Sequence, residues 1–228
     1  MNYSKFAAVF VAAIAATLLV TPSFAAKKVK WKMHSAWGSN LPHLGTSGVR
    51  FAKNIKRMSG GNFNIKFFEP GALVPGNEGF DATSKGSVDA AWTTAGYDVG
   101  KHPALAFFTA VPFGPSMGEF FAWKKFGGGS EIQQRVYAAS GIQQMDCHAI
   151  GPETSGWFKT EVTDLKQLRG LKMRFFGLGA RVMQKIGVST QLLAGGDIFP
   201  ALEKGVIDAT EFSMPAMDIK YGFYQIAK

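Results

Sequence analysis

An acidic residue stands where a buried strand is expected, in the segment "ALEKGVIDATEF" (201–212). Val206, Ile207 and Ala209 are typical of a strand inside the protein, and Glu211 follows them closely. A carboxylate that leaves water at such a place needs a cation, a metal ion or a set of hydrogen-bond donors. Glu211 is therefore a candidate for binding or catalytic chemistry.

Arg174 and Glu153 are two further candidates for the same chemistry. Arg174 lies in the apolar segment "LKMRFF" (171–176), and its planar guanidinium suits a carboxylate. Side chains alternate along a strand, so Arg174 is expected on the face opposite to Met173 and Phe175. It can point into a cleft there, or form an ordinary salt bridge at a sheet edge. Glu153 lies in "GPETSGWFK", at the start of an expected strand.

Two carboxylates and an arginine have three interpretations. They can form a salt-bridge network, an acid/base pair of an enzyme, or a hard-cation site that also binds an anion. Calcium takes about six to eight oxygen ligands, so two glutamates and a carbonyl would leave positions for a bidentate ligand. Spacing alone does not decide among the three.

Aromatic residues supply candidates for the walls of a cleft. Trp37, Tyr97 and Phe212 fall at the ends of expected strands, where ligands of α/β proteins bind. A second group is expected in core and hinge packing rather than in a cofactor site: Phe107, Phe108 and Phe113.

Common cofactor and nucleophile motifs are absent from the sequence. It contains no P-loop, no Gly-x-Gly-x-x-Gly and no Gly-x-Ser-x-Gly. The glycine-rich turn "FGLGAR" (176–181) fits none of these patterns, but it can aim backbone N–H groups at an anion. The histidines show no His-x-x-x-His pair, so we expect no zinc site.

Strand and helix patterns alternate along the chain, which is typical of an α/β architecture with largely parallel sheets. The expected strands are 29–35, 63–68, 88–93, 171–176, 189–193 and 206–212.

An internal similarity indicates two related units. The segments 80–90 and 199–209 align without gaps and are identical at six of eleven positions. Each is typical of a helix that ends in Lys-Gly and is followed at once by a strand. The alternative is that the similarity arose by chance, or that it reflects the residue types that helix-to-strand turns commonly use. Two similar α/β lobes would place Tyr97 and Glu211 near a common cleft.

The N-terminus predicts export. Residues 1–25 have one lysine, an apolar run at 6–20, and Ser23 and Ala25 before a cleavage site, as in a secretory signal peptide. An uncleaved membrane anchor is disfavoured because the run is short for a bilayer span. We therefore expect a periplasmic protein that does not span the membrane after cleavage.

Cysteine content and charge narrow the class further. Cys147 is the only cysteine, so no intrachain disulfide can form, and we expect it to be a small buried residue. The formal net charge is +9, with lysines and arginines spread along the chain. This pattern favours a basic surface that attracts small anions over one that binds nucleic acid.

The sequence resembles the solute-binding proteins of tripartite ATP-independent periplasmic (TRAP) transporters, in the branch that binds 2-oxo and 2-hydroxy monocarboxylates. The resemblance rests on "LRGLKMRFFGLGARVMQKIGVSTQLLAGGDIFPALEKGVIDATEF", "GPETSGWFK", "MSGGNFNIKFFEPGALVP" and "FFTAVPFG". It runs from about residue 30 to the end of the chain, and residues 168–212 are its most specific part.

The resemblance implies a two-lobed, type II-like periplasmic binding protein whose cleft closes on its ligand. It implies a signal peptide at 1–25, a first lobe at 27–141, a second lobe at 142–212, and the start of a hinge or return segment at 213–228. Family members continue past this point, so we expect the chain to be incomplete at its C-terminus.

The resemblance also implies roles for the candidate residues. Arg174 would pair with the ligand carboxylate, and Glu211, Phe212 and Glu153 would hold a cation that bridges protein and ligand. Tyr97 and Trp37 match residues near the ligand. No organic cofactor is implied, and the partners would be a small organic acid and the TRAP membrane permease subunits.

Two residues depart from the family pattern. Glu153 replaces a glutamine, and its added charge should favour calcium over sodium. Phe212 replaces a tryptophan, which alters the pocket wall but keeps the main-chain oxygen.

Other functions remain open at this point. The protein can be a binding protein of an ABC transporter for amino acids, a sensory protein that docks on a receptor, or a periplasmic enzyme that uses Glu153 and Glu211 as acid and base. An enzyme would need a nucleophile or an activated water, and no motif supplies one.

Overall fold

A computed structural model describes residues 27–228 of the chain. The predicted signal peptide, residues 1–25, lies outside this range. Within it, no helix combines the length and the apolar character needed to cross a membrane.

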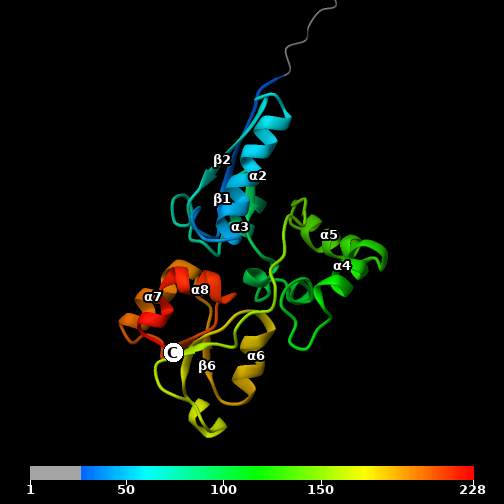
Figure 1. The fold of residues 1–228 in the computed structure, drawn as a ribbon. Coiled ribbons are helices and arrows are strands. Elements are labelled where there is room, and N and C mark those ends of the chain that lie inside the picture. Colours follow the sequence, from blue (N-terminus) through cyan, green and yellow to red (C-terminus); the bar gives the residue numbers. More distant parts are fainter. Residues whose placement is uncertain (1–26) are drawn as a thin grey trace, which may run out of the picture.

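The first sheet has three parallel strands in the order β2-β1-β3. A helix crosses from each strand to the next, as parallel pairing requires. The elements of this unit, blue to green in Figure 1, are β1 (Val29–Ser35), α2 (Leu44–Met58), β2 (Phe63–Phe68), α3 (Gly79–Ser84) and β3 (Ala90–Trp92).

The second sheet has four strands in the order β4-β7-β5-β6, with β4 antiparallel to β7 and the other pairs parallel. Its central part repeats the strand–helix–strand pattern of the first sheet. The elements are β4 (Trp157–Phe158), η3 (Leu165–Leu168), β5 (Lys172–Arg174), α6 (Gly177–Lys185), β6 (Ser189–Gln191), α7 (Gly195–Glu203) and β7 (Ala209–Thr210).

A helical arm lies between the two sheets in the sequence and projects to one side of the molecule (Figure 1). An extended segment then returns from the arm to β4. The arm and the short elements before it are η1 (Ala95–Asp98), η2 (Pro103–Phe108), α4 (Met117–Phe126) and α5 (Gly129–Ala138).

The last described residues pack on the second sheet. Helix α8 (Pro215–Tyr221) lies beside α7, and η4 (Phe223–Gln225) follows it. Lys228 exchanges two backbone hydrogen bonds with Phe158, at 3.0 and 2.9 Å, and so extends the sheet next to β4. The structure has one sheet on each side of residues 141–142, and the lobe boundaries at 141 and 212 stay predictions.

The two units share details as well as topology. Met33 of β1 pairs with Ala90 of β3, and Met173 of β5 pairs with Ala209 of β7. Helix α3 before β3 and helix α7 before β7 each end in a Lys-Gly turn. The glycines of these turns, Gly86 and Gly205, have φ angles of 71° and 72°. A positive φ favours glycine, which explains why both turns keep it.

The same aspartate contact recurs in both units. The Asp89 carboxylate accepts a hydrogen bond from the backbone N–H of Lys32 at 2.7 Å, and the backbone N–H of Asp89 donates to the Lys32 carbonyl at 3.0 Å. Asp208 makes the same two contacts with Lys172, at 3.1 and 2.7 Å. The two related α/β units expected from the internal similarity are therefore confirmed.

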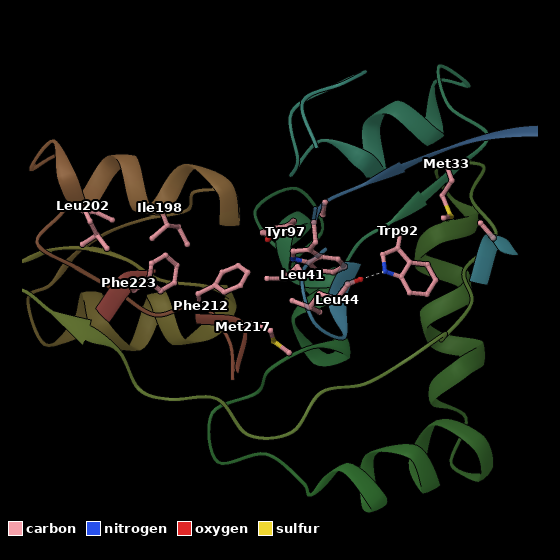
Figure 2. Packing of buried hydrophobic residues seen from close by; sticks show 14 of the residues in the cluster. Met33, Leu41, Leu44, Trp92, Tyr97, Ile198, Leu202, Phe212, Met217 and Phe223 are labelled. Carbon is pink, nitrogen blue, oxygen red and sulfur yellow. Dashed lines mark hydrogen bonds between the residues drawn. The ribbon is translucent and has the colours of Figure 1, made fainter. Parts of the chain in front are cut away.

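The largest apolar core joins the two units. Figure 2 shows Phe212 between residues of the second unit, such as Ile198 and Phe223, and residues of the first, such as Leu41 and Tyr97. Trp92, at the far side of this cluster, donates from Nε1 to the Leu44 carbonyl at 2.7 Å. The core therefore fixes the wall between the sheets, where the candidate residues lie.

Three expectations are wrong. Strands β3, β5, β6 and β7 are shorter than the predicted 88–93, 171–176, 189–193 and 206–212. Cys147 is exposed, since it lies on the extended segment before β4 rather than in a core. Phe107 is 63% exposed and Phe113 is fully exposed, so neither serves in core packing.

Candidate functional site

Arg174 is the last residue of β5, and its side chain is only 1% exposed. Its Nε donates to the Leu193 carbonyl at 3.2 Å. Its Nη1 donates to the Glu211 main-chain oxygen at 2.6 Å and to Glu211 Oε2 at 3.1 Å. These bonds fix the guanidinium, and they leave Nη2 outside them. The rings of Phe176 and Phe212 have their centroids 5.8 and 5.3 Å from the arginine Cζ, within cation–π range.

Glu211 follows β7 directly and is 4% exposed. Its Oε2 accepts both the Arg174 guanidinium and the backbone N–H of Phe176, at 3.1 Å each. Its Oε1 is buried and has no hydrogen-bond partner among residues 27–228. The buried acid is thus neutralised by an arginine, while one carboxylate oxygen still lacks a partner.

The glycine-rich turn contributes to this arrangement. Phe176 is the N-cap of α6, and its N–H points at the Glu211 carboxylate. The expectation that "FGLGAR" aims a backbone N–H at an anion is confirmed, and the anion is a side chain of the protein itself.

Glu153 lies next to Glu211 and is half-buried. Burial, followed by the negative charge of Glu211, raises the pKa of Glu153 from 4.5 to about 8. Arg174 and Ser213 act in the opposite direction but do not outweigh these causes. Two carboxyl groups side by side must share a proton or a cation.

The donor set fits a hard cation. It offers the orphaned Oε1 of Glu211, a second carboxyl group at Glu153, and the main chain around Phe212, and hard cations take such oxygen ligands. The same pair also forms a salt bridge, since Glu211 Oε2 binds Arg174. The salt-bridge and cation interpretations of the sequence are therefore compatible.

Asp218 fixes the chain segments that carry the site, and its role was not predicted from the sequence. It is fully buried in the first turn of α8. Its carboxylate accepts the Ser213 N–H at 3.0 Å, Trp157 Nε1 at 2.8 Å and Thr154 Oγ1 at 3.3 Å. Because Thr154 follows Glu153, these bonds fix both chain segments that carry the site.

A cavity of about 820 Å³ opens in front of Arg174. Of the six predicted ligand-contacting residues, five line it: Trp37, Tyr97, Glu153, Arg174 and Phe212. Glu211 lines a neighbouring cavity of about 180 Å³, and Glu153 and Phe176 border both. The structure therefore brings the predicted residues together, and Glu211 lies next to the larger cavity rather than on its wall.

Contacts between the two units shape the walls of this cavity. The rings of Trp37 and Tyr97 are 6.3 Å apart, and Tyr97 meets Phe176 edge-on at 5.6 Å. Gly96 packs against Phe176 so closely that an added Cβ would lie 1.9 Å from the ring Cζ. Phe176 thus connects Arg174, Glu211 and the first unit. Its place beside the "LKMR" arginine was the only signal for it in the sequence.

His148 also lines the cavity and was not predicted. Its ring stacks on Trp92 with centroids 5.1 Å apart and meets Trp37 edge-on at 6.3 Å. Burial lowers the pKa of His148 below its usual 6.5, with a smaller effect from His43 and Arg50. The ring is therefore a neutral part of an aromatic wall at neutral pH.

Comparison with known proteins identifies relatives across nearly the whole described chain. A curated relative is 38% identical over 231 residues, covering all of this chain and 63% of its own length. It is the monocarboxylate 2-oxoacid-binding periplasmic protein of Nostoc sp. strain PCC 7120. Its name describes a binding protein.

Solved structures of TRAP solute-binding proteins share the fold. One from Bordetella bronchiseptica, with copurified calcium and picolinate, is 35% identical with a TM-score of 0.85, and the match covers 88% of this chain and 60% of that one. One from Pseudoalteromonas atlantica, with sodium and pyruvate, is 33% identical with a TM-score of 0.84, over 88% and 61% of the chains. The two-lobed α/β fold expected from the sequence is confirmed.

The chain spans about 60% of the length of these relatives. The model of the DctP family, described as bacterial extracellular solute-binding protein, family 7, matches residues 33–228. The chain therefore belongs to this family of solute-binding proteins.

Proposed function

We propose that the protein is the periplasmic solute-binding subunit of a TRAP transporter and that it binds a 2-oxo or 2-hydroxy monocarboxylate. The names of its relatives support this class: the Nostoc protein binds monocarboxylate 2-oxoacids, and structures from Pseudoalteromonas atlantica and Colwellia psychrerythraea hold pyruvate with sodium and with calcium. The predicted signal peptide supports the periplasmic location.

The observation that carries the proposal is the buried group of Arg174, Glu211 and Glu153. Arg174 is held rigidly at the wall of the cavity, so it can pair with a carboxylate without losing side-chain entropy. The unpartnered Glu211 Oε1 and the adjacent Glu153 would hold a cation, together with the main chain at Phe212. Bound there, the cation would attract the carboxylate and the 2-oxygen of the acid.

The charge of the second carboxyl group favours calcium. Glu153 and Glu211 together carry two negative charges when both are ionised, and more ligand charge favours a divalent ion. Sodium is the alternative if Glu153 keeps its proton.

The charges around the cavity favour one carboxylate over two. Arg174 is the only lysine or arginine among the described residues that line the cavity. A second carboxylate would be buried without a cation and would lose binding energy. Tyr97 and Trp37 would form an apolar wall beside the acid.

Ligand binding would also connect the two units. A ligand held by Arg174 of the second unit and by Tyr97 or Trp37 of the first favours the arrangement in which both are in contact. The closed form would be the one that the membrane permease recognises.

A thermal-shift screen tests this function. The purified protein is heated with 2-oxo and 2-hydroxy acids, once with calcium and once with a chelator. A ligand at a hundred times its Kd should stabilise the fold by about 2.7 kcal/mol. Arg174→Gln should lose the shift and Arg181→Gln, an exposed arginine on α6, should keep it. No shift with any acid would refute the monocarboxylate proposal, and a shift with amino acids in chelator would favour an ABC-type binding protein.

A further inference from the structure

We propose that the acid carries an aromatic side chain, so that the ligand is a 3-aryl-2-oxo or 3-aryl-2-hydroxy acid. This inference rests on the function proposed above and concerns the part of the cavity that lies away from Arg174. Three observations carry it: the volume of the cavity, the side chains of its walls and the absence of free charge there.

The cavity is much larger than a small acid requires. Its volume of about 820 Å³ lies in the range of about 300–1,000 Å³ typical of sites that bury drug-sized ligands. Pyruvate has only six non-hydrogen atoms, so it would occupy only the region beside Arg174. A larger apolar ligand would bury more of the apolar wall and gain the free energy of that burial.

Several aromatic rings line the wall beyond the head-group site: Phe107, Phe108, Phe113, Phe120, Phe121 and Trp123. Phe108 stacks on Trp123 with ring centroids 5.5 Å apart, and Phe120 meets Trp123 at 5.8 Å. Phe107 and Phe113 lie on the same cavity with large exposed rings. Flat rings bind another ring with about 0.5–1.5 kcal/mol beyond the area that is buried. A ligand ring therefore fits this wall better than a polar group would.

Among residues 27–228, no unpaired charged side chain lines this wall. Asp146 lines the cavity, but its carboxylate is 2.9 Å from Lys124 Nζ, and Lys124 is only 3% exposed beneath the wall. The same lysine lies 5.3 Å from the Phe108 ring centroid. Since these two charges compensate each other, a distal ammonium or carboxylate on the ligand would find no free partner. The distal part of the ligand is therefore uncharged and apolar.

Isothermal titration calorimetry with three probes, in the presence of calcium, separates this inference from the proposed function. Phenylpyruvate should bind with a Kd at least about tenfold lower than that of pyruvate. Phenylpropionate, which lacks the 2-oxygen, should bind more weakly than phenylpyruvate. Pyruvate binding as tightly as phenylpyruvate would overturn the aromatic inference and leave the proposed function intact. No binding of either 2-oxo acid would overturn both.

A matched pair of variants on α4 locates the ring. Phe120 lines the cavity, whereas Phe126 ends the same helix, is 80% exposed and lies outside the lining. Phe120→Ala should raise the Kd of phenylpyruvate about tenfold and leave that of pyruvate unchanged, which also shows that the variant folds. Phe126→Ala should change neither constant. Equal effects of Phe120→Ala on both acids, or none on phenylpyruvate, would contradict the inference.

Discussion

Arg174 Nη1 donates hydrogen bonds to two atoms of Glu211, the main-chain oxygen at 2.6 Å and Oε2 at 3.1 Å. One guanidinium nitrogen therefore fixes both the backbone and the side chain of the acid after β7. The second carboxylate oxygen, Oε1, stays buried and unpartnered among the described residues. The pair is therefore a structural contact, and Oε1 is the atom that the proposed cation would bind.

Removal of the arginine should destabilise the fold. Arg174→Gln leaves the Glu211 carboxylate buried without its cation, and a broken buried pair costs about 3–5 kcal/mol. Urea unfolding should show this loss, and the double variant Arg174→Gln with Glu211→Gln should recover part of it. Arg181→Gln removes the same charge from an exposed position and should change stability by less than about 0.5 kcal/mol. If Arg174→Gln lost as little stability as Arg181→Gln, the Arg174–Glu211 pair would contribute little to the free energy of unfolding.

The pH dependence of stability should reveal the proton on Glu153. Without ligand or cation, its pKa is about 8 in the folded protein, above its usual 4.5. Between these values the folded state holds a proton that the unfolded chain has lost, so stability falls as pH rises. The slope from one such group is at most about 1.4 kcal/mol per pH unit.

The variant Glu153→Gln isolates this effect from other acids. The pKa of Asp98 is raised to about 7 and that of Asp218 to about 6, mainly by burial, so both add slopes of the same sign. Glutamine cannot ionise, so the stability of the protein minus that of Glu153→Gln should decrease from pH 4.5 to about 8. Urea unfolding across this range measures the difference. Parallel pH profiles for the two proteins would show that Glu153 is already ionised.

A methyl group at Gly96 should separate the two units. In Gly96→Ala the new Cβ would lie 1.9 Å from Phe176 Cζ, so either the ring or the first unit must shift. We expect a loss of about 1–3 kcal/mol in stability and a weaker Kd for pyruvate, measured by thermal unfolding and calorimetry. Gly100→Ala is the control, because its Cβ would meet nothing within 4 Å. Equal behaviour of the two variants would mean that the Gly96–Phe176 contact does not set the cavity.

Replacement of Asp218 should lower both the stability of the fold and the affinity of the proposed cation site. Asp218→Ala leaves the Ser213 N–H and Trp157 Nε1 without an acceptor, at about 1–3 kcal/mol for each buried donor. Calcium affinity should fall with stability, because the segment that carries Glu153 is no longer fixed. Asp218→Asn, which keeps one carbonyl oxygen, should be intermediate. Asp197→Ala, an exposed acid in the first turn of α7, should behave like the unchanged protein.

The sequence predicted the fold and the candidate residues where local patterns carried the information. The similarity of 80–90 and 199–209 indicated two related units because helix ends and strand starts depend on nearby residues. The apolar strand "LKMRFF" indicated that Arg174 would be buried beside an anion, and Glu211 is that anion. The second inference uses the free-energy cost of burying a charge among apolar residues, which the sequence pattern alone can reveal.

Features set by distant contacts were not predictable in the same way. Phe176 acts through Gly96 and Tyr97, and Asp218 through Thr154 and Trp157, all far apart in the sequence. The burial expected for Cys147 and Phe113 was wrong because apolar character alone does not say which segment covers a residue. The ligand-binding roles of Trp37 and Tyr97 stay predictions.

Calorimetric titration of pyruvate with and without calcium tests the central claim most directly. The claim predicts binding to the protein in calcium, little binding in chelator, and little binding to Glu211→Gln in either condition, since that variant lacks the carboxylate that would hold the ion. Unfolding of Glu211→Gln in urea confirms that this variant is folded. Equal affinity for pyruvate in calcium and in chelator would contradict the claim that a cation joins the acid to Glu153 and Glu211.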